Sequence, residues 1–317
     1  MIQQVLGRVG IFAVSLLGAS AVIFLVCSAL PGDIAQIMLG EGADPAALAA
    51  LRAELGTDRP AVVRYGGWVA GMAGGDFGVS YLTRTPVANL LAPRVGVTLW
   101  LVGFSMGLAV LIALPLGMLA AQKQRHWQGL LASSLAQVGM AIPAFWAGII
   151  LVLVFAVSLR WLPANGYVPL RTDPLQWALH LVLPTVALAG VQAAVLVRYV
   201  RSAFIEVLAE DYYRTARSIG WIPWKAMLRH GLRNAALSLV TVVGLQLSSV
   251  LVGAIIVESV FALPGLGSLL LSAVAQRDLM VIQGTVMFLV LAVLVINFLV
   301  DLSYLVIDPR LRPGVSR

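Results

Sequence analysis

DYYRTARSIGWIPWKAMLRHGLRNA, residues 211–235, is a basic segment in an otherwise strongly apolar chain. It holds five arginines and lysines and one histidine against a single acid, Asp211. Apolar segments too long for a strand of a soluble protein flank it, at 179–203 and 237–260. This alternation indicates two membrane-spanning helices joined by a loop in water, and it decides the fold class.

The composition of the whole chain is that of a polytopic membrane protein. Of 317 residues, 60% are hydrophobic and 11% are charged, and the mean hydropathy is +0.95. A soluble domain is nearer half apolar and a quarter charged. The net charge of +7 does not indicate nucleic-acid binding, because the cations lie beside the apolar segments. The single cysteine, Cys27, excludes a disulfide within the chain and a CxxC metal site.

Six apolar segments are long enough to cross the hydrocarbon core of a membrane, which takes about 20 helical residues. They are 9–30, 97–121, 130–157, 179–203, 237–260 and 279–305. Such runs form helices rather than the short alternating strands of a barrel, so the sequence predicts an all-α protein with six transmembrane helices. The first run exceeds the ~7–15 apolar residues of a signal peptide, and we expect it to be retained.

The distribution of basic residues predicts that both termini are cytoplasmic. In that orientation thirteen of the 21 lysines and arginines are cytoplasmic. They are Arg8, Lys123, Arg125, Arg198, Arg201, Arg214, Arg217, Lys225, Arg229, Arg233, Arg310, Arg312 and Arg317. Five of the remaining eight fall in one long loop at 31–95. Because long loops cross the membrane largely regardless of charge, the short loops decide the orientation.

The spans divide the chain into four regions. Residues 1–30 hold the N-terminal region and first helix, 31–96 an extracytoplasmic loop or cap, 97–305 a five-helix core, and 306–317 a cytoplasmic tail.

One helix is predicted inside the 31–96 loop. Asp44 is the expected N-cap, Pro45 the first helical residue and Gly56 the C-terminal stop. The loop is then either a small packed cap or a surface that meets an extracytoplasmic partner, and the sequence pattern favours the packed cap.

The chain carries no motif for metal or nucleotide chemistry. Its three histidines form no HExxH pair, and neither of its two lysines, Lys123 and Lys225, belongs to a GxxxxGK[ST] phosphate loop. We therefore expect no catalytic residue, metal site or cofactor in this chain. A serine-based intramembrane hydrolase is not excluded by motif alone, although no serine stands beside a suitable histidine.

Ionisable residues and helix breakers in the spans are candidates for a transport pathway. Arg198, Glu258 and Asp301 lie near span ends, where such residues either carry function or only snorkel and cap. A proton-coupled carrier would place acids near the midplane, and none is found there. The predicted pathway or gating residues are Pro143, Trp146, Arg198, Gln246 and Glu258.

The basic segment itself predicts two helices joined at a glycine. Residues 204–219 contain no Gly or Pro and are expected to form one helix, with Glu210 and Arg214 as an i,i+4 pair. Gly220 suits the position after the helix end, and Pro223 suits the first turn of the next helix.

Two interpretations of this segment stay open. The basic stripe Lys225–Arg229–Arg233 could meet lipid phosphates. Alternatively, the first helix and its turn dock into a cytoplasmic partner, for which the small residues Thr215, Ala216 and Gly220 would permit close approach.

The pattern "RTARSIG" followed by "LRHGLRNA" resembles the cytoplasmic EAA-type loop of binding-protein-dependent ABC importer permeases. In that family the pattern is Glu-Ala-Ala, three residues, then Gly; here Arg214-Thr215-Ala216 and Gly220 occupy these positions. The resemblance covers almost the whole chain, through "GGDFGVSY" (74–81), "AIPAFW" (141–146), "VESVFALPGLG" (257–267) and "NFLVDLSYLVIDPR" (297–310).

The resemblance implies the type I ABC importer permease fold and a transport subunit, not an enzyme, in the cytoplasmic (inner) membrane of a prokaryote. Its implied partners are a homologous second permease, two ATPase subunits that bind ATP and Mg, an extracytoplasmic substrate-binding protein and membrane lipids. The ATPases would dock on the loop. The implied docking residues are Arg214, Thr215, Ala216 and Gly220, with Asp211, Arg233 and Asn234 as braces.

The substrate stays open at this stage. The family subgroup that serves dipeptides, oligopeptides and nickel shares these motifs, and we expect peptides, with nickel or a nickel chelate as the alternative. A stand-alone channel or proton-coupled carrier is the rival from another class.

Overall fold

The computed structural model describes residues 2–29, 34–40 and 42–307. In this part of the chain all the regular elements are helices, joined by turns and loops, and β pairing is confined to an isolated bridge between Val79 and Pro86. Five helices are long and apolar enough to span a membrane, or six if one bent pair counts as a span. The five are α1 (Ile2–Ala29), α5 (Val87–Gln122), α8 (Pro174–Ala209), α11 (Leu232–Val260) and α13 (Leu279–Ile307). The all-α prediction is thereby confirmed, and the predicted six spans appear as five long helices and one bent pair.

The predicted third span, 130–157, is wrong as a single straight helix. It consists of α6 (Trp127–Ala141) and α7 (Ala144–Leu151), and α7 continues as a π-helical segment, η1 (Val152–Ser158). The two halves are bent by 97°. Proline disfavours the helical region for the residue before it. Ile142 is extended accordingly, with ψ 120°, and Pro143 begins the second half.

Helices α5 and α8 form the centre of the bundle. Each has 36 residues, and α5 begins ten residues before the predicted start of its span at 97. Their contact is close because the residues between them are small: a Cβ on Gly117 would lie 2.6 Å from the Cβ of Val200. Small residues at a helix crossing are typical of membrane bundles.

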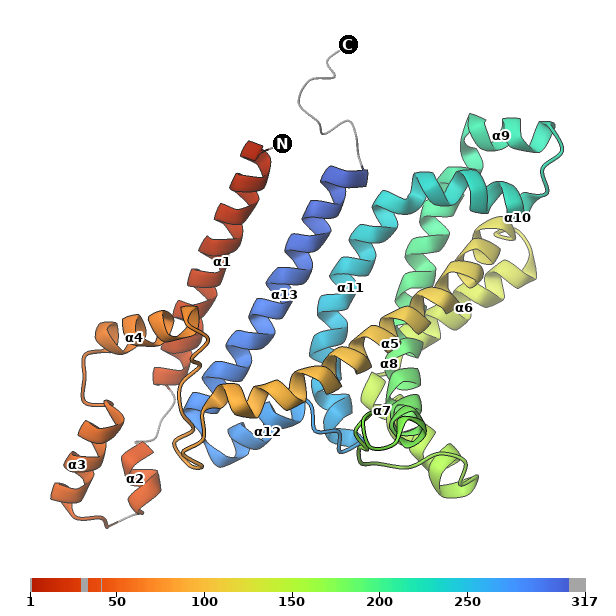
Figure 1. The fold of residues 1–317 in the computed structure, drawn as a ribbon. Coiled ribbons are helices and arrows are strands. Elements are labelled where there is room, and N and C mark those ends of the chain that lie inside the picture. The colour runs from red at the N-terminus through yellow and green to blue at the C-terminus, as the bar shows by residue number, and fades with distance from the viewer. Residues whose placement is uncertain (1, 30–33, 41, 308–317) are drawn as a thin grey trace.

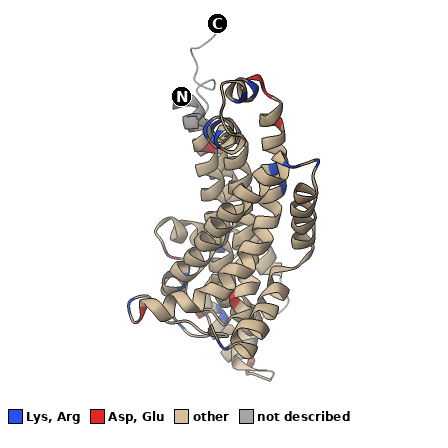
Figure 2. Ribbon diagram, turned by 90° about the vertical axis from the view of Figure 1, so that its right-hand side faces the viewer, with Lys and Arg blue, Asp and Glu red and all other residues tan. Residues whose placement is uncertain are grey.

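The bundle has two distinct ends (Figure 1). At one end lie the start of α1, the end of α13, the α5–α6 connection, and α9 (Asp211–Ser218) with α10 (Pro223–Ala226). We call this the loop end. At the opposite end, the cap end, lie α2 (Ile34–Leu39), α3 (Pro45–Leu55), α4 (Ala61–Ala73) and α12 (Leu266–Gln276). Figure 2 shows the charged residues gathered toward these two ends.

The predicted helix in the long loop is confirmed as α3. The Asp44 side chain accepts a hydrogen bond from the Ala46 N–H, and Gly56 ends the helix with φ +67°. The expectation of a packed cap is wrong for this helix, because α3 has no buried residue. It packs mainly on α2, and the pair projects away from the bundle (Figure 1).

Helix α4 instead ties the cap end to α1 and α13. Phe24 of α1 packs against the rings of Tyr65 and Trp68, with centroids 5.4 and 6.4 Å apart. Cys27 is buried in the same cluster, as expected for a small apolar residue. The predicted tail at 306–317 falls, from residue 308 on, outside the described residues.

Candidate functional site

The basic loop folds as two helices and a glycine turn, but its first helix is shorter than predicted. Helix α8 ends at Ala209, and Glu210 adopts an extended backbone with ψ 148° before α9 begins at Asp211. The expected Glu210–Arg214 pair is therefore wrong. Arg214 instead meets its other acidic neighbour, with its Nη1 3.5 Å from Oδ1 of Asp211.

The turn after α9 depends on Gly220. The Gly220 N–H donates to the Arg217 carbonyl at 3.2 Å, and the Trp221 N–H donates to the Ala216 carbonyl at 3.1 Å. These two bonds are the Schellman pattern, which places a left-handed residue just past the helix end. Gly220 has φ +94°, and Pro223 follows as the first residue of α10. The predicted glycine stop and proline start are confirmed.

One face of the loop is buried against the bundle. Tyr213, Ala216, Ala226 and Met227 are all nearly inaccessible, and they pack in one apolar cluster with residues of α5, α8 and α11 such as Phe204. A π-helical turn, η2 (Met227–Gly231), joins α10 to α11. Ala216 was expected to face a partner, but it is only 4% exposed, so its small size serves packing within this chain.

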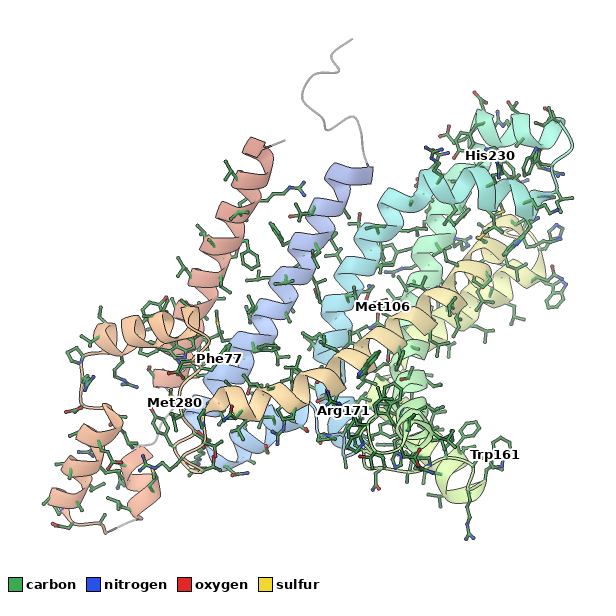
Figure 3. All side chains as sticks on the ribbon, in the orientation of Figure 1. Phe77, Met106, Trp161, Arg171, His230 and Met280 are labelled. Atoms are coloured by element: carbon green, nitrogen blue, oxygen red, sulfur yellow. The ribbon has the colours of Figure 1, made fainter. Side chains whose placement is uncertain are left out.

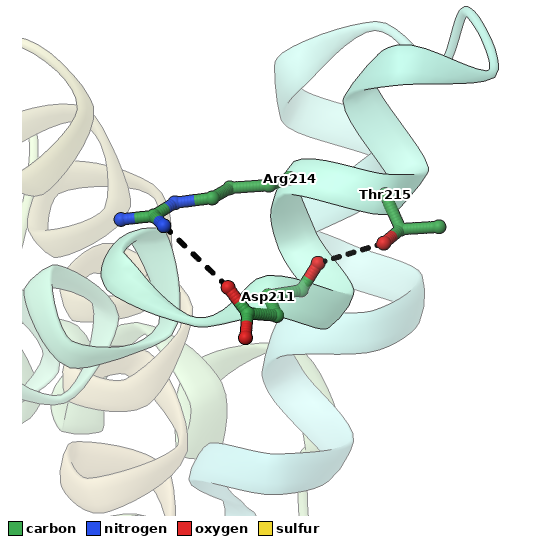
Figure 4. Close-up of polar contacts among 3 residues, drawn as sticks. All are labelled: Asp211, Arg214 and Thr215. Carbon is green, nitrogen blue, oxygen red and sulfur yellow. Dashed lines mark hydrogen bonds and ion pairs between the residues drawn. The ribbon is translucent and has the colours of Figure 1, made fainter.

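The opposite face of α9 is exposed. Thr215 donates its hydroxyl to the Asp211 carbonyl at 2.9 Å, beside the Asp211–Arg214 pair (Figure 4). The Asp211 and Arg214 side chains are 95% and 70% accessible. A pair this exposed contributes little to stability, so both groups are free to contact another molecule. Ile219, 72% exposed at the end of α9, adds an apolar side chain to this face.

The predicted braces behave differently from one another. Asn234 donates its side-chain amide to the His230 carbonyl at 2.9 Å and lies beside Tyr212. Burial raises the pKa of the Tyr212 phenol, and the Asn234 amide partly opposes that shift. Arg233 is exposed and forms no ion pair with any described residue. Asn234 thus links α9 to the first turn of α11, whereas Arg233 is exposed on the surface of that turn.

The five predicted pathway residues are not brought together into one polar site. Pro143 stands at the bend between α6 and α7, and Trp146, half exposed, lines a cleft of about 330 Å³ between α7 and α8. The Arg198 guanidinium lies 5.0 Å from the ring centre of Tyr199. Gln246 is half-buried on α11. Their role in a pathway stays a prediction.

Glu258 is the exception, because it has a defined and fully buried place at the cap end. One carboxylate oxygen accepts from the Thr98 hydroxyl at 2.5 Å, and the other accepts from the N–H groups of Gly267 and Ser268 at 2.7 and 3.2 Å. The Thr98 hydroxyl oxygen also accepts from the Leu266 N–H at 2.9 Å. A carboxylate at a helix N-terminus is favourable, and together the two side chains cap α12.

Thr98 was missed by sequence reasoning. It precedes Glu258 by 160 residues, and a threonine in an apolar helix gives no signal of its own. The pair caps a short helix with Gly265 and Gly267 at its start. In the sequence this start appears only as part of the motif VESVFALPGLG (257–267).

Two family models match this chain. Residues 113–313 match the family described as binding-protein-dependent transport system inner membrane component, and residues 1–102 match the N-terminal region described for the same class of membrane component.

Two kinds of relatives align along most of this chain. A protein of Brucella abortus (strain 2308) named as a peptide transport system permease is 40% identical over 289 residues, covering 91% of this chain and 92% of its own. A glutathione transport system permease of Salmonella typhimurium is 40% identical over 312 residues, covering 98% and 99%.

A solved structure shares the fold. The inward-facing methionine ABC transporter MetNI superposes with a TM-score of 0.58 at 19% identity, over 69% of this chain and 96% of that one.

Proposed function

The chain belongs to the family of binding-protein-dependent transport system inner membrane components, and from this premise we propose that it is the membrane subunit through which an ATP-driven importer moves short peptides into the cell. As a member of that family it is a multi-pass protein of the cytoplasmic membrane. We propose that it hydrolyses no ATP itself.

The observation that carries the proposal is the two-sided loop of α9 and α10. Its inner face is buried against α5, α8 and α11, while Asp211, Arg214 and Ile219 on its outer face contact nothing that would restrain them strongly. A loop fixed on one side and free on the other suits the transmission of movement from a docked ATPase to the bundle.

The proposed assembly has the loop end in the cytoplasm. Two ATPase subunits would dock on this loop and its counterpart in a homologous second permease. A substrate-binding protein would deliver the peptide at the cap end. Closure of the ATPases would then shift both permeases as packed units, so that access alternates between the two sides.

The named relatives support the proposed substrate class. Relatives that share 40% identity over nearly the whole chain are named for peptide and glutathione transport, and this favours short peptides over the nickel alternative. Both alternatives can be tested in one assay with labelled dipeptide, glutathione and a nickel chelate.

The test is uptake by proteoliposomes that contain the chain, its partner permease, the ATPases and the binding protein. We expect dipeptide uptake that requires ATP and stops when the ATPase subunits are omitted. Uptake by the permeases alone would instead show the stand-alone channel or carrier and overturn the proposal.

The loop supplies the internal control for this assay. Gly220→Leu should abolish uptake at normal membrane insertion, because a leucine does not adopt φ +94° without strain. Gly103→Leu, in an exposed part of α5 with no atom within 4 Å of a built Cβ, should leave uptake near the unsubstituted level.

A further inference from the structure

A cleft of about 280 Å³ with a mixed polar and apolar lining lies at the cap end, beside α1 and away from the basic loop. It is bounded by α4, by the segment that contains Asp76 and Gly78, and by the start of α13. Figure 3 labels Met280 of this wall and the adjacent Phe77. The lining combines cationic, anionic and neutral polar groups with the Trp68 ring, which distinguishes it from the apolar clefts between the spans.

Two arginines line the cleft on either side of the start of α4. Arg59 precedes the helix and is exposed, and Arg64 is half-buried in its first turns. The Arg64 guanidinium lies 5.7 Å from the ring centre of Phe24, and neither arginine forms an ion pair with a described residue. Their positive charge is therefore not neutralised within this part of the chain.

Neutral donors and one acid complete the lining. Gln283 is only 6% exposed and makes no hydrogen bond to any described residue, although it faces the cleft. Because this amide makes no bond within that part of the chain, a ligand that reached it would gain a hydrogen bond. The lining group that is buried without a partner is the Trp68 indole N–H, and such a group costs free energy. Asp76 uses one carboxylate oxygen to accept the Gly78 N–H at 2.8 Å, which leaves its second oxygen available.

Tyr81 is a protonated donor in the same lining. The pKa of its phenol is raised, mainly by burial. The positive charge of Arg64 opposes this shift, and the negative charge of Asp278 adds to it. Asp278 itself is held by the Ser80 hydroxyl at 2.5 Å. This bond fixes the wall that carries Tyr81 against the start of α13.

The cleft is a built feature rather than a gap between mobile segments. The Tyr65 hydroxyl lies 2.9 Å from the Ser20 hydroxyl, which fastens α4 to α1. Glycines let the walls approach each other closely: a Cβ on Gly78 would lie 2.2 Å from the Met280 methyl, and one on Gly71 would lie 3.2 Å from the Asp76 carbonyl.

We propose that this cleft binds the zwitterionic backbone of a dipeptide, with the carboxylate toward Arg59 and Arg64 and the ammonium group toward Asp76. Both signs of charge line the cleft, which a simple anion would not require. Its volume lies just below the ~300–1,000 Å³ of pockets for drug-sized ligands, so the ligand is small. The proposal rests on the function proposed above both for placing the cap end outside the cell and for the choice of a peptide as the ligand.

The test is dipeptide binding to the assembled complex in nanodiscs without the binding protein, measured by calorimetry with Ala-Ala. We expect Arg64→Gln to weaken binding by about tenfold or more, because a hydrogen bond to a charged group contributes about 1.5–3 kcal/mol. Gln283→Leu should weaken it by roughly fivefold for one neutral hydrogen bond. Arg171→Gln, an exposed arginine of another cap-end loop outside the cleft (Figure 3), should leave binding unchanged.

Blocked ligands separate this proposal from plain anion binding. N-acetyl-Ala-Ala and Ala-Ala-amide should both bind much more weakly than Ala-Ala, and acetate should compete poorly. Equal binding by any of these three, unchanged affinity in the Arg64 and Gln283 variants, or no binding of Ala-Ala would overturn the site.

The same preparation shows which conclusion has failed. ATP hydrolysis that the binding protein stimulates, in a complex that does not bind Ala-Ala, would remove the cleft proposal and leave the transport proposal standing. Thermal unfolding of each variant identifies any that has lost its fold. If one of the two cleft variants, Arg64→Gln or Gln283→Leu, is unfolded, binding by the other variant tests the site.

Discussion

The hydroxyl of Thr98 donates a 2.5 Å hydrogen bond to the carboxylate of Glu258, which is fully buried 160 residues further along the chain. Since Thr98 belongs to α5 and Glu258 to α11, and both also bind N–H groups at the start of α12, the pair joins three helices at the cap end. The arrangement satisfies three of the donors that a helix N-terminus leaves without partners.

Removal of the Glu258 carboxylate should destabilise the protein strongly. Glu258→Ala leaves the N–H groups of Gly267 and Ser268 and the Thr98 hydroxyl without their acceptor, and each unsatisfied buried donor costs about 1–3 kcal/mol. We expect a loss of about 3 kcal/mol or more in the free energy of unfolding. In a chain of this size that lowers Tm by roughly 4 °C or more, measured by tryptophan fluorescence in detergent.

Two variants test the cause of that loss. Glu258→Gln keeps an acceptor for the backbone groups and should cost clearly less than the alanine. Glu54→Ala, which removes a 63%-accessible partner of Arg84, should change Tm little. Equal Tm for the Glu258→Ala and unsubstituted proteins would show that the buried bonds do not matter.

Position 220 should rank residues by how well they adopt a left-handed backbone. Asparagine tolerates φ near +94° better than alanine, and β-branched residues tolerate it worst. ATP-dependent uptake should fall in the order Gly, Asn, Ala, Val. No atom lies within 4 Å of a Cβ built on Gly220, so side-chain volume is not the cause. An order that followed volume instead would contradict this explanation.

Neighbouring residues of α9 should separate coupling from stability. Arg214→Ala removes a 70%-accessible side chain and should leave Tm within about 1 °C while it lowers uptake per ATP hydrolysed. Ala216→Leu inserts three carbons into a site that is 4% exposed and should lower Tm, because overpacking a core costs about 1–3 kcal/mol. The opposite result, an unstable Arg214 variant with normal coupling, would reverse the assignment of the two faces.

The orientation can be read from single cysteines in a Cys27→Ala background. Ala50→Cys on the exposed face of α3 and Ser218→Cys at the end of α9 are both accessible positions. An impermeant maleimide should label position 50 in intact spheroplasts, and position 218 only after permeabilisation. Labelling of position 218 in intact spheroplasts would place the loop end outside and refute the assembly proposed here.

Much of the fold was predictable because it follows from local chemistry. Apolar length located the spans, and the short polar signals located Asp44 as a cap and Gly220 as a left-handed stop. These features depend on a few neighbouring residues, which a single sequence contains in full.

The errors arose where distant packing overrides local preference. Nothing in residues 204–219 forbids a continuous helix. The break at Glu210 nevertheless directs the side chains of Tyr213 and Ala216 toward the cluster that contains Phe204. The pairing of Thr98 with Glu258 is likewise a tertiary fact. The 97° bend at Pro143 follows from a proline that was noted, but its angle depends on how both halves pack on α8.

Helix α8 has a geometric consequence for the proposed transport cycle. It runs without interruption for 36 residues from its Asp173 cap to Ala209, and at 1.5 Å per residue it is about 54 Å long. A rod of that length that pivots near its middle swings its two ends in opposite directions, by roughly 5 Å each for about 10° of rotation. Rigid-body rotation of α8, driven from the cytoplasmic side, would narrow the opening at one membrane face and widen the opening at the other. The backbone of α8 itself would not change.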